Sequence, residues 1–198
     1  MGIKAIIDRC ERLYRDVDLG CVQEWKARTG GKAVGHMPVY VPRELIHAAG
    51  LLPVGVMGGG DDVEIIRGDA YFQSYFCHLP RSTVELGLAG KRDCLDGMLF
   101  PSICDVIRNL SGMWQLMFPG KYVKYIDFPQ TFNGAGREFY RFELASLLLD
   151  MEQLSGVRAT RERLNQSIAL YNDNRRALAA LYDLRAAEPS KVPTSELY

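Results

Sequence analysis

Two cysteines of this chain stand where a strand or loop gives way to a helix. Cys104 follows the apolar run 97–100 and lies in the turn 101–105, while Cys77 precedes Pro80, a residue suited to the first turn of a helix. The positive end of a helix favours the thiolate, which is the form of cysteine that binds metals and attacks electrophiles. We therefore interpret Cys77 and Cys104 as metal ligands or reactive thiols, with buried space-filling cysteines as the alternative.

The remaining cysteines point to structural roles. Cys94 precedes the run 97–100 and is expected at the opposite edge of a sheet. Cys10 and Cys21 fall on helical segments, where free cysteine often packs as a small buried hydrophobe. Neither candidate ligand has a CxxC partner, so a metal site would need further ligands from elsewhere. An odd total of five cysteines without an export signal argues against a disulfide framework.

Histidines and glycines near these turns are further candidates for the site. His78 directly follows the first candidate cysteine and is a candidate proton donor there, whereas His47 lies in an apolar helical pattern and is expected to be a satisfied core residue. The glycine run 58–60 is not a GxGxxG motif, and the adjacent Asp61 and Asp62 would repel a pyrophosphate. We expect a close-packed turn at 58–60. No GxSxG motif is present, which counts against an ordinary hydrolase.

Short apolar runs alternate with helical patterns through the middle of the chain. The predicted strands are 33–37, 52–57, 97–100 and 122–126, and the predicted helices between and after them are 43–49, 80–88, 104–117 and 137–154. This alternation predicts an α/β fold, Rossmann-like or flavodoxin-like, with a small parallel sheet flanked by helices. Ligands of such sheets bind beyond the carboxyl ends of the strands, so we expect the site among the turns 38–44, 58–62, 101–105 and 127–132.

Helical segments flank this α/β region on both sides. An N-terminal helical arm is predicted over 1–30, with Asp18 as the cap of its second helix. The α/β domain that carries Cys77 and Cys104 is expected over 31–156, and a helical segment over 157–198 with Thr160 as the N-cap of a long helix. Residues 192–196 have the pattern of another helix start. We therefore expect this segment to lead into a second domain that the sequence lacks.

Charge and hydropathy exclude several classes of protein. Lys plus Arg and Asp plus Glu number 24 each, so the chain lacks the positive surplus of a dedicated nucleic-acid binder. No apolar run approaches the roughly 20 residues of a membrane span, and the N-terminal segment lacks the features of a signal peptide. We expect a cytoplasmic protein that binds neither nucleic acid nor membrane.

Four stretches of the sequence carry a resemblance to a known family. Residues 36–54, 74–78 and 96–114, together with the helix 168–176, resemble the 2-hydroxyacyl-CoA dehydratase D-component / benzoyl-CoA reductase family. Segments 75–81 and 95–114 look closest to catalytic subunits of ATP-dependent benzoyl-CoA reductases. The resemblance implies a [4Fe-4S] cluster held by three cysteines of each subunit, with Cys77 and Cys104 at the first two ligand positions. The third position belongs to the absent second domain.

The resemblance also implies a reaction and its partners. It implies an oxygen-sensitive, hetero-oligomeric oxidoreductase of anaerobic aromatic degradation, in which two homologous subunits pair around an aromatic acyl-CoA. An ATP-hydrolysing iron–sulfur activator would supply single electrons from ferredoxin, and benzoyl-CoA would become a cyclohexadiene carbonyl-CoA. The alternatives are an (R)-2-hydroxyacyl-CoA dehydratase subunit and a structural subunit without a cluster.

Candidate groups around such a cluster follow from the same segments. A proton donor is needed, and His78 and Tyr40 are the candidates. Apolar walls that exclude water are expected from aromatic residues, with an ordinary core role as the alternative for Trp114 and Phe118; the full set is Tyr75, Phe76, Phe100, Trp114 and Phe118.

Overall fold

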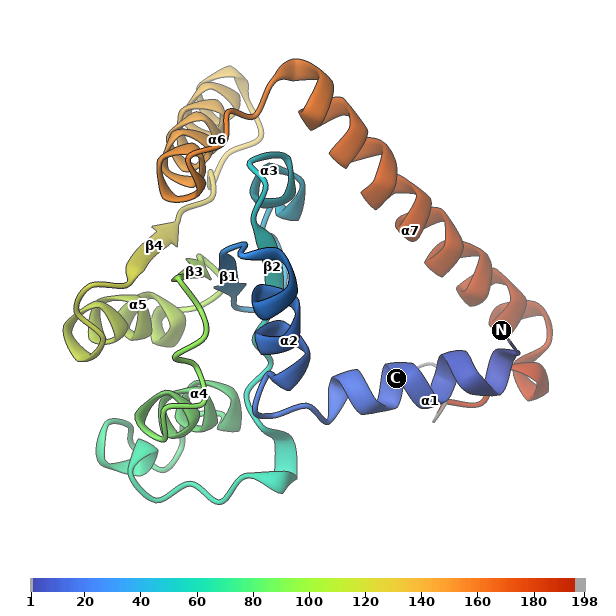
Figure 1. Ribbon diagram of the computed structural model, residues 1–198, viewed down its shortest axis with the longest axis horizontal. Helices are drawn as coiled ribbons and strands as arrows, with labels where there is room; N and C mark the ends of the chain where they lie inside the picture. Colours follow the sequence, from blue (N-terminus) through green and yellow to red (C-terminus); the bar gives the residue numbers. More distant parts are fainter. Residues whose placement is uncertain (1, 195–198) are drawn as a thin grey trace.

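A parallel four-stranded sheet forms the centre of the molecule (Figure 1). The computed structural model describes residues 2–194. Its strands are β1 (Ala33–His36), β2 (Leu52–Gly55), β3 (Gly97–Pro101) and β4 (Tyr122–Ile126), in the spatial order β2-β1-β3-β4. The predicted α/β class and all four strands are confirmed, with ends that differ by at most two residues from the expected ranges.

The strand order creates a switch point between β1 and β3. The chain leaves β1 toward β2 on one side and then crosses to β3 on the other side, so the two connections run in opposite directions. Backbone hydrogen bonds hold the carboxyl ends together: Met37 N donates to Leu99 O at 3.0 Å, and Ser102 N donates to Ile126 O at 2.9 Å. In open α/β sheets the loops diverge at such a point and leave a crevice for ligands.

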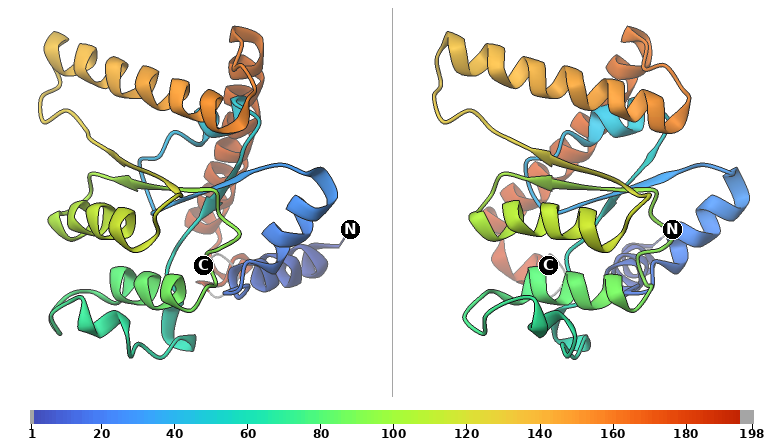
Figure 2. Two further views of the ribbon diagram at one scale, coloured as in Figure 1. Left: turned by 60° about the vertical axis from the view of Figure 1, so that its left-hand side comes forward. Right: turned by 90° about the vertical axis from the view of Figure 1, so that its left-hand side faces the viewer.

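Helices cover both faces of the sheet (Figure 2). On one side lie α4 (His78–Leu88) and α5 (Asp105–Met117), and on the other lie α3 (Arg43–Ala48) and α6 (Gly134–Ser155). Side chains of β3 alternate between the two cores, with Met98 and Phe100 facing α5 and Leu99 facing α6. Because α4 leads into β3 and α5 follows it, both helices begin at the carboxyl edge of the sheet.

Four of the five residues predicted to form aromatic walls belong to the core or pack against it. Phe100 and Trp114 are 0% and 4% exposed, and their ring centroids lie 6.0 Å apart beneath the sheet. Phe76 and Phe118 pack against the same core, and Tyr75 is exposed. The alternative of an ordinary core role is therefore confirmed for Trp114 and Phe118, and Phe100 shares that core, because apolar aromatic side chains between two helices and a sheet gain more by filling the interior.

The N-terminal arm consists of α1 (Ile3–Tyr14) and α2 (Gly20–Thr29). Asp18 does not cap α2: Asp16 accepts hydrogen bonds from the backbone N–H groups of Gly20 and Cys21, each at 2.8 Å. Helix α1 extends away from the sheet and buries none of its residues (Figure 1). Its Cys10 and the Cys21 of α2 are exposed, so the expected buried packing role is wrong.

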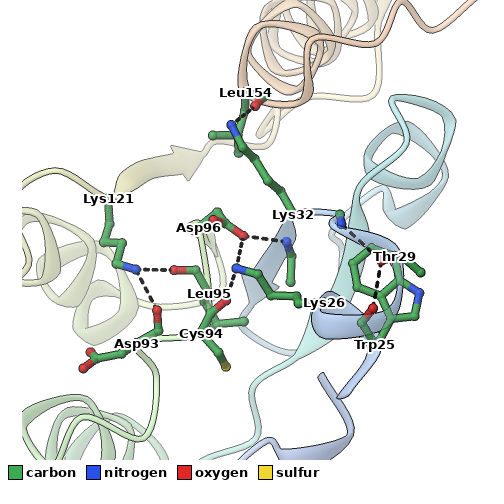
Figure 3. Close-up of polar contacts among 12 residues, drawn as sticks. Trp25, Lys26, Thr29, Lys32, Asp93, Cys94, Leu95, Asp96, Lys121 and Leu154 are labelled. Atoms are coloured by element: carbon green, nitrogen blue, oxygen red, sulfur yellow. Dashed lines mark hydrogen bonds and ion pairs between the residues drawn. The ribbon is translucent and has the colours of Figure 1, made fainter. Parts of the chain in front are cut away.

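Lysine side chains connect the amino edge of the sheet to its neighbours (Figure 3). Lys26 of α2 donates to Asp96 Oδ2 and to the carbonyl of Cys94, each at 2.7 Å, and Asp96 Oδ2 also accepts from Ala33 N at 2.8 Å. Lys121 donates to two carbonyl groups of the turn before β3. These contacts fix α2 against the starts of β1 and β3.

The long helix α7 (Arg161–Ala187) contacts α3 through polar groups. Thr160 caps it as predicted, accepting from Arg163 N at 3.3 Å. Ser167 Oγ donates to Glu44 O at 2.9 Å and therefore accepts from Nδ1 of His47 at 3.0 Å. His47 is exposed, so its predicted core position is wrong although its ring is hydrogen-bonded.

Three short 3₁₀ turns complete the described chain, at Gly60–Asp62, Gly68–Ala70 and Pro189–Lys191. The apolar stripe predicted for the long helix is largely exposed in α7, as at Ile168 and Leu178. The predicted start of a further helix at 192–196 extends beyond the described residues. Among residues 2–194, no helix has the length and apolarity needed to cross a bilayer.

Candidate functional site

Cys77 and Cys104 occupy equivalent positions on neighbouring helices. Cys77 is the N-cap residue of α4 and Cys104 is the N-cap residue of α5, and both have extended backbone conformations. Both side chains are exposed, and neither caps its helix through a side-chain hydrogen bond. Since α4 and α5 lie side by side and both begin at the carboxyl edge, the structure brings the two thiols to one edge of the sheet (Figure 2).

A buried carboxylate ties the loop before Cys77 to α4. Glu85 is 8% exposed and accepts from Ile66 N at 2.9 Å, from Gly68 N at 2.8 Å and from Arg67 Nε at 3.3 Å. Burial by itself raises the pKa of Glu85, but these hydrogen bonds outweigh it and hold the pKa below its usual value. Glu85 shapes the segment that ends at Cys77, and no motif in the sequence marks it for this role.

The glycine run after β2 is the close-packed turn that the sequence predicts. Gly58 has a left-handed backbone with φ of 75°, and Gly59 N donates to Ser82 Oγ at 3.3 Å. A Cβ on Gly59 would lie 2.1 Å from a side-chain carbon of Val63. This turn therefore packs against α4 and its own loop, and the predicted close-packed turn at 58–60 is confirmed.

The donor chemistry at the carboxyl edge suits an iron–sulfur cluster, and two cysteine donors are present there. Such clusters take cysteine thiolates as ligands, usually four. Within residues 2–194, no group of three or more His, Cys, Asp or Glu side chains is arranged to hold a metal ion. Cys94 is at the opposite edge, as predicted, and burial raises its pKa. Cys77 and Cys104 can therefore supply two ligands, and the others must come from outside the described residues.

A cavity of about 620 Å³ opens at the switch point, on the α6 face of the same edge. Residues that follow three of the strands line it, together with the first turns of α6. Its volume falls in the range of small-molecule sites. The lining residues are Tyr40, Ser102, Phe128, Pro129, Thr131, Phe132, Asn133, Gly136, Arg137 and Tyr140.

Three aromatic rings of this cavity form a chain of contacts, in which the middle ring contacts the other two. The rings of Tyr40 and Phe128 have centroids 5.4 Å apart at an interplanar angle of 68°, and those of Phe128 and Tyr140 are 5.4 Å apart at 44°. Burial raises the pKa of Tyr140, and the negative charge of the nearby Glu44 carboxylate raises it further. The three rings form a continuous aromatic wall.

Backbone strain positions one end of this wall. Val39 and Tyr40 have φ values of 59° and 57°, in the left-handed region that side chains rarely adopt and that is least favourable for a β-branched residue such as Val39. Strained residues of this kind persist only where surrounding structure holds them, and they cluster at ligand sites. The strained turn leaves Tyr40 67% exposed at the cavity.

A tight turn positions the other end. Asn133 caps α6, with its Oδ1 accepting from Gly136 N at 3.0 Å. A Cβ on Gly136 would lie 2.0 Å from the carbonyl oxygen of Thr131, so glycine is required for this close approach. The turn sets the cavity-lining residues 129–136 against the start of α6.

The structure separates the predicted site residues into two neighbouring groups. Tyr40 lines the cavity with Ser102, which belongs to the same turn as Cys104. His78 is the exposed first residue of α4, beside Cys77, and does not line this cavity. The sequence marked the turn 127–132 as a ligand position without singling out a residue in it. The aromatic pair Phe128 and Tyr140 was therefore missed.

Comparisons with known proteins place the chain in a family. A family model described as 2-hydroxyglutaryl-CoA dehydratase, D-component, matches residues 38–198. The chain is 55% identical over its full length to a subunit of the benzoyl-CoA reductase of Thauera aromatica, covering 52% of that protein. It is 30% identical over 98% of its length to the beta subunit of the (R)-2-hydroxyglutaryl-CoA dehydratase of Acidaminococcus fermentans, covering 51% of it.

A third relative has an aromatic acyl group in its name. The chain is 31% identical to the (R)-phenyllactyl-CoA dehydratase beta subunit of Clostridium sporogenes, over 86% of the chain and 46% of that protein. The chain thus spans about half the length of the curated relatives it matches. With its family match over most of its length and its parallel α/β fold, the chain belongs to the 2-hydroxyglutaryl-CoA dehydratase D-component family.

Proposed function

We propose that this chain is a subunit of an oxygen-sensitive, ATP-dependent benzoyl-CoA reductase. In that reaction the aromatic ring of benzoyl-CoA gains two electrons and two protons and becomes a cyclohexadiene carbonyl-CoA. The observation that carries the proposal is the 55% identity over the full chain to a protein named as a benzoyl-CoA reductase subunit. Its partners would be a homologous catalytic subunit, an ATP-hydrolysing iron–sulfur activator, and ferredoxin as the electron donor.

Cys77 and Cys104 are the residues of this chain that would hold a [4Fe-4S] cluster. When bound, the cluster supplies electrons singly and at a potential set by its charge, hydrogen bonding and burial. Both cysteines are N-cap residues and lie at the amino ends of α4 and α5. The assignment is supported by the fact that neither thiol makes a capping hydrogen bond to its own helix.

The proton that follows each electron needs a donor with an exposed acidic hydrogen. Tyr40 Oη and the imidazole of His78 are the two candidates, and they lie on different sides of the same edge. Tyr40 has the better supported position, because its ring lines a cavity that can hold a ligand. A general acid contributes about 100-fold to 10,000-fold in rate.

Variants of the two candidates separate their roles. In the assembled enzyme, Tyr40→Phe is expected to lower kcat at least about 100-fold while KM for benzoyl-CoA stays within a factor of two or so. His78→Gln is then expected to leave kcat within the same small factor. The reverse result would assign the proton to His78, and unchanged kcat in both variants would contradict both assignments.

A dehydratase is the second candidate function. The matched family model and two of the relatives carry dehydratase names, and the identity to those relatives is 30% and 31%. A dehydratase uses the electron catalytically to eliminate water, whereas the reductase consumes electrons in proportion to product. Counting the electrons consumed per product formed, with the full-length gene product and its partner subunits, separates the two.

A further inference from the structure

The aromatic wall at the switch point has the shape of a recognition site for a flat ring. Tyr40, Phe128 and Tyr140 approach the cavity from three different segments, and aromatic pairs in offset or edge-to-face geometry favour a further ring against them. The fold-level rule for open α/β sheets places a ligand at this same point. Two independent observations, the switch point and the aromatic lining, therefore coincide.

We infer that this cavity selects the aryl group of an aromatic acyl thioester, and that Phe128 is a specificity-determining residue. This inference rests on the proposed function. The cavity lining includes Ser102, which belongs to the same turn as Cys104, so the cavity and one proposed cluster ligand share a turn. The volume of about 620 Å³ exceeds that of an aryl ring and leaves room for the thioester and the start of its tail.

The strained turn at Val39 and Tyr40 is the positioning element of this site. Left-handed backbone at two consecutive non-glycine residues, one of them β-branched, costs free energy that a simple connection between β1 and α3 does not require. The result is a tyrosine ring held edge-on to Phe128 instead of folded into the core. Arg137, at the start of α6, adds a positive charge to the lining, which suits a ligand with an anionic tail.

Binding measurements on the full-length gene product with its partner subunits test the inference. The probes are benzoyl-CoA, cyclohexanecarbonyl-CoA and free CoA, which share the tail and differ in the planar ring. Phe128→Leu keeps an apolar side chain and removes the ring, and we expect it to weaken benzoyl-CoA binding about tenfold. Binding of cyclohexanecarbonyl-CoA should change less than about twofold.

Two further variants guard against a folding effect. Phe132 lines the cavity but is fully exposed, so Phe132→Leu cannot disturb the core, and we expect it to weaken benzoyl-CoA binding about threefold. Phe142→Leu is the matched control, since Phe142 is an exposed α6 residue outside the cavity lining. It should leave all three affinities unchanged.

The possible outcomes separate this inference from the proposed function. If Phe128→Leu weakens the binding of all three probes equally, the cavity holds the CoA portion and the inference is overturned. If Phe128→Leu weakens binding no more than Phe142→Leu does, the cavity holds neither the aryl group nor the CoA portion, and the inference is again overturned. Ring-selective binding without electron-dependent product formation would support the inference while removing the reductase proposal. If the enzyme reduces benzoyl-CoA but Phe128→Leu leaves the preference for the aromatic ring unaltered, the reductase proposal is supported and the inference is overturned.

Discussion

One buried carboxylate, Glu85, decides how the segment leading to Cys77 is held. It accepts from two backbone N–H groups and one arginine, and the neutral amide keeps only one acceptor oxygen and places an NH2 group against a donor at the other position. Glu85→Gln should lower the free energy of unfolding by about 1.5–3 kcal/mol. Denaturant unfolding of both proteins measures this, with Glu138→Gln, in an exposed pair with Arg141, as a control that changes little.

The pH dependence of the Glu85 contribution has a definite sign. Its folded-state pKa is lowered, so the stabilisation is complete above the unfolded value of about 4.3 and is lost as the pH falls through the folded pKa. The stability difference between the wild-type protein and Glu85→Gln should therefore be constant near neutral pH and shrink in acid. A difference that grows in acid would contradict the assigned hydrogen bonds.

At the scale of elements, the start of α6 depends on one close backbone approach. Gly136→Ala would place a methyl group 2.0 Å from the Thr131 carbonyl oxygen, so the turn 129–136 must shift. We expect a loss of about 1–3 kcal/mol in unfolding free energy and a disturbed cavity.

The same helix provides a matched control for that glycine. Gly134→Ala places its methyl group in open space, and alanine should be neutral or stabilising by up to about 1 kcal/mol in the helix. Thermal unfolding of both variants measures the contrast. Equal effects of the two alanines would show that the contact between Gly136 and Thr131 does not shape this turn.

Elements with a strong local signal were predictable from the sequence. Apolar runs marked β1 to β4, and Thr160 and the cysteine positions marked three helix starts. The cap of α2 was not predictable in this way, because Asp16 reaches it only through the left-handed backbone of Leu19. The aromatic wall was also missed, because Tyr40 is far from Phe128 and Tyr140 in the sequence and meets Phe128 only through the strand order.

For the whole molecule, one lysine connects the N-terminal arm to the sheet. Lys26 Nζ bonds Asp96 and the carbonyl of Cys94 in a partly buried position (Figure 3). Lys26→Met should leave both acceptors short of a donor and destabilise the protein by about 1–3 kcal/mol. Hydrogen exchange of the α2 amides should become faster, while Lys4→Met on α1 should leave it unaltered. Unchanged exchange in Lys26→Met would contradict the anchoring role.

The carboxyl edge of the sheet carries two features on its two faces. The thiols of Cys77 and Cys104 start the helices of one face, and the aromatic cavity opens on the other. The turn from Ser102 to Cys104 belongs to both. In the function proposed above, the cluster would lie on one side of the edge and the substrate ring on the other.

The most direct test of the central claim is the iron and acid-labile sulfide content of anaerobically purified protein. The sample is the full-length gene product with its partner subunits, because the described residues supply two cysteine ligands. We predict roughly four irons and four sulfides per site, lost in Cys77→Ala and in Cys104→Ala and kept in Cys10→Ala, whose thiol is exposed on α1. Absence of iron, or iron that is indifferent to both ligand substitutions, would contradict the account.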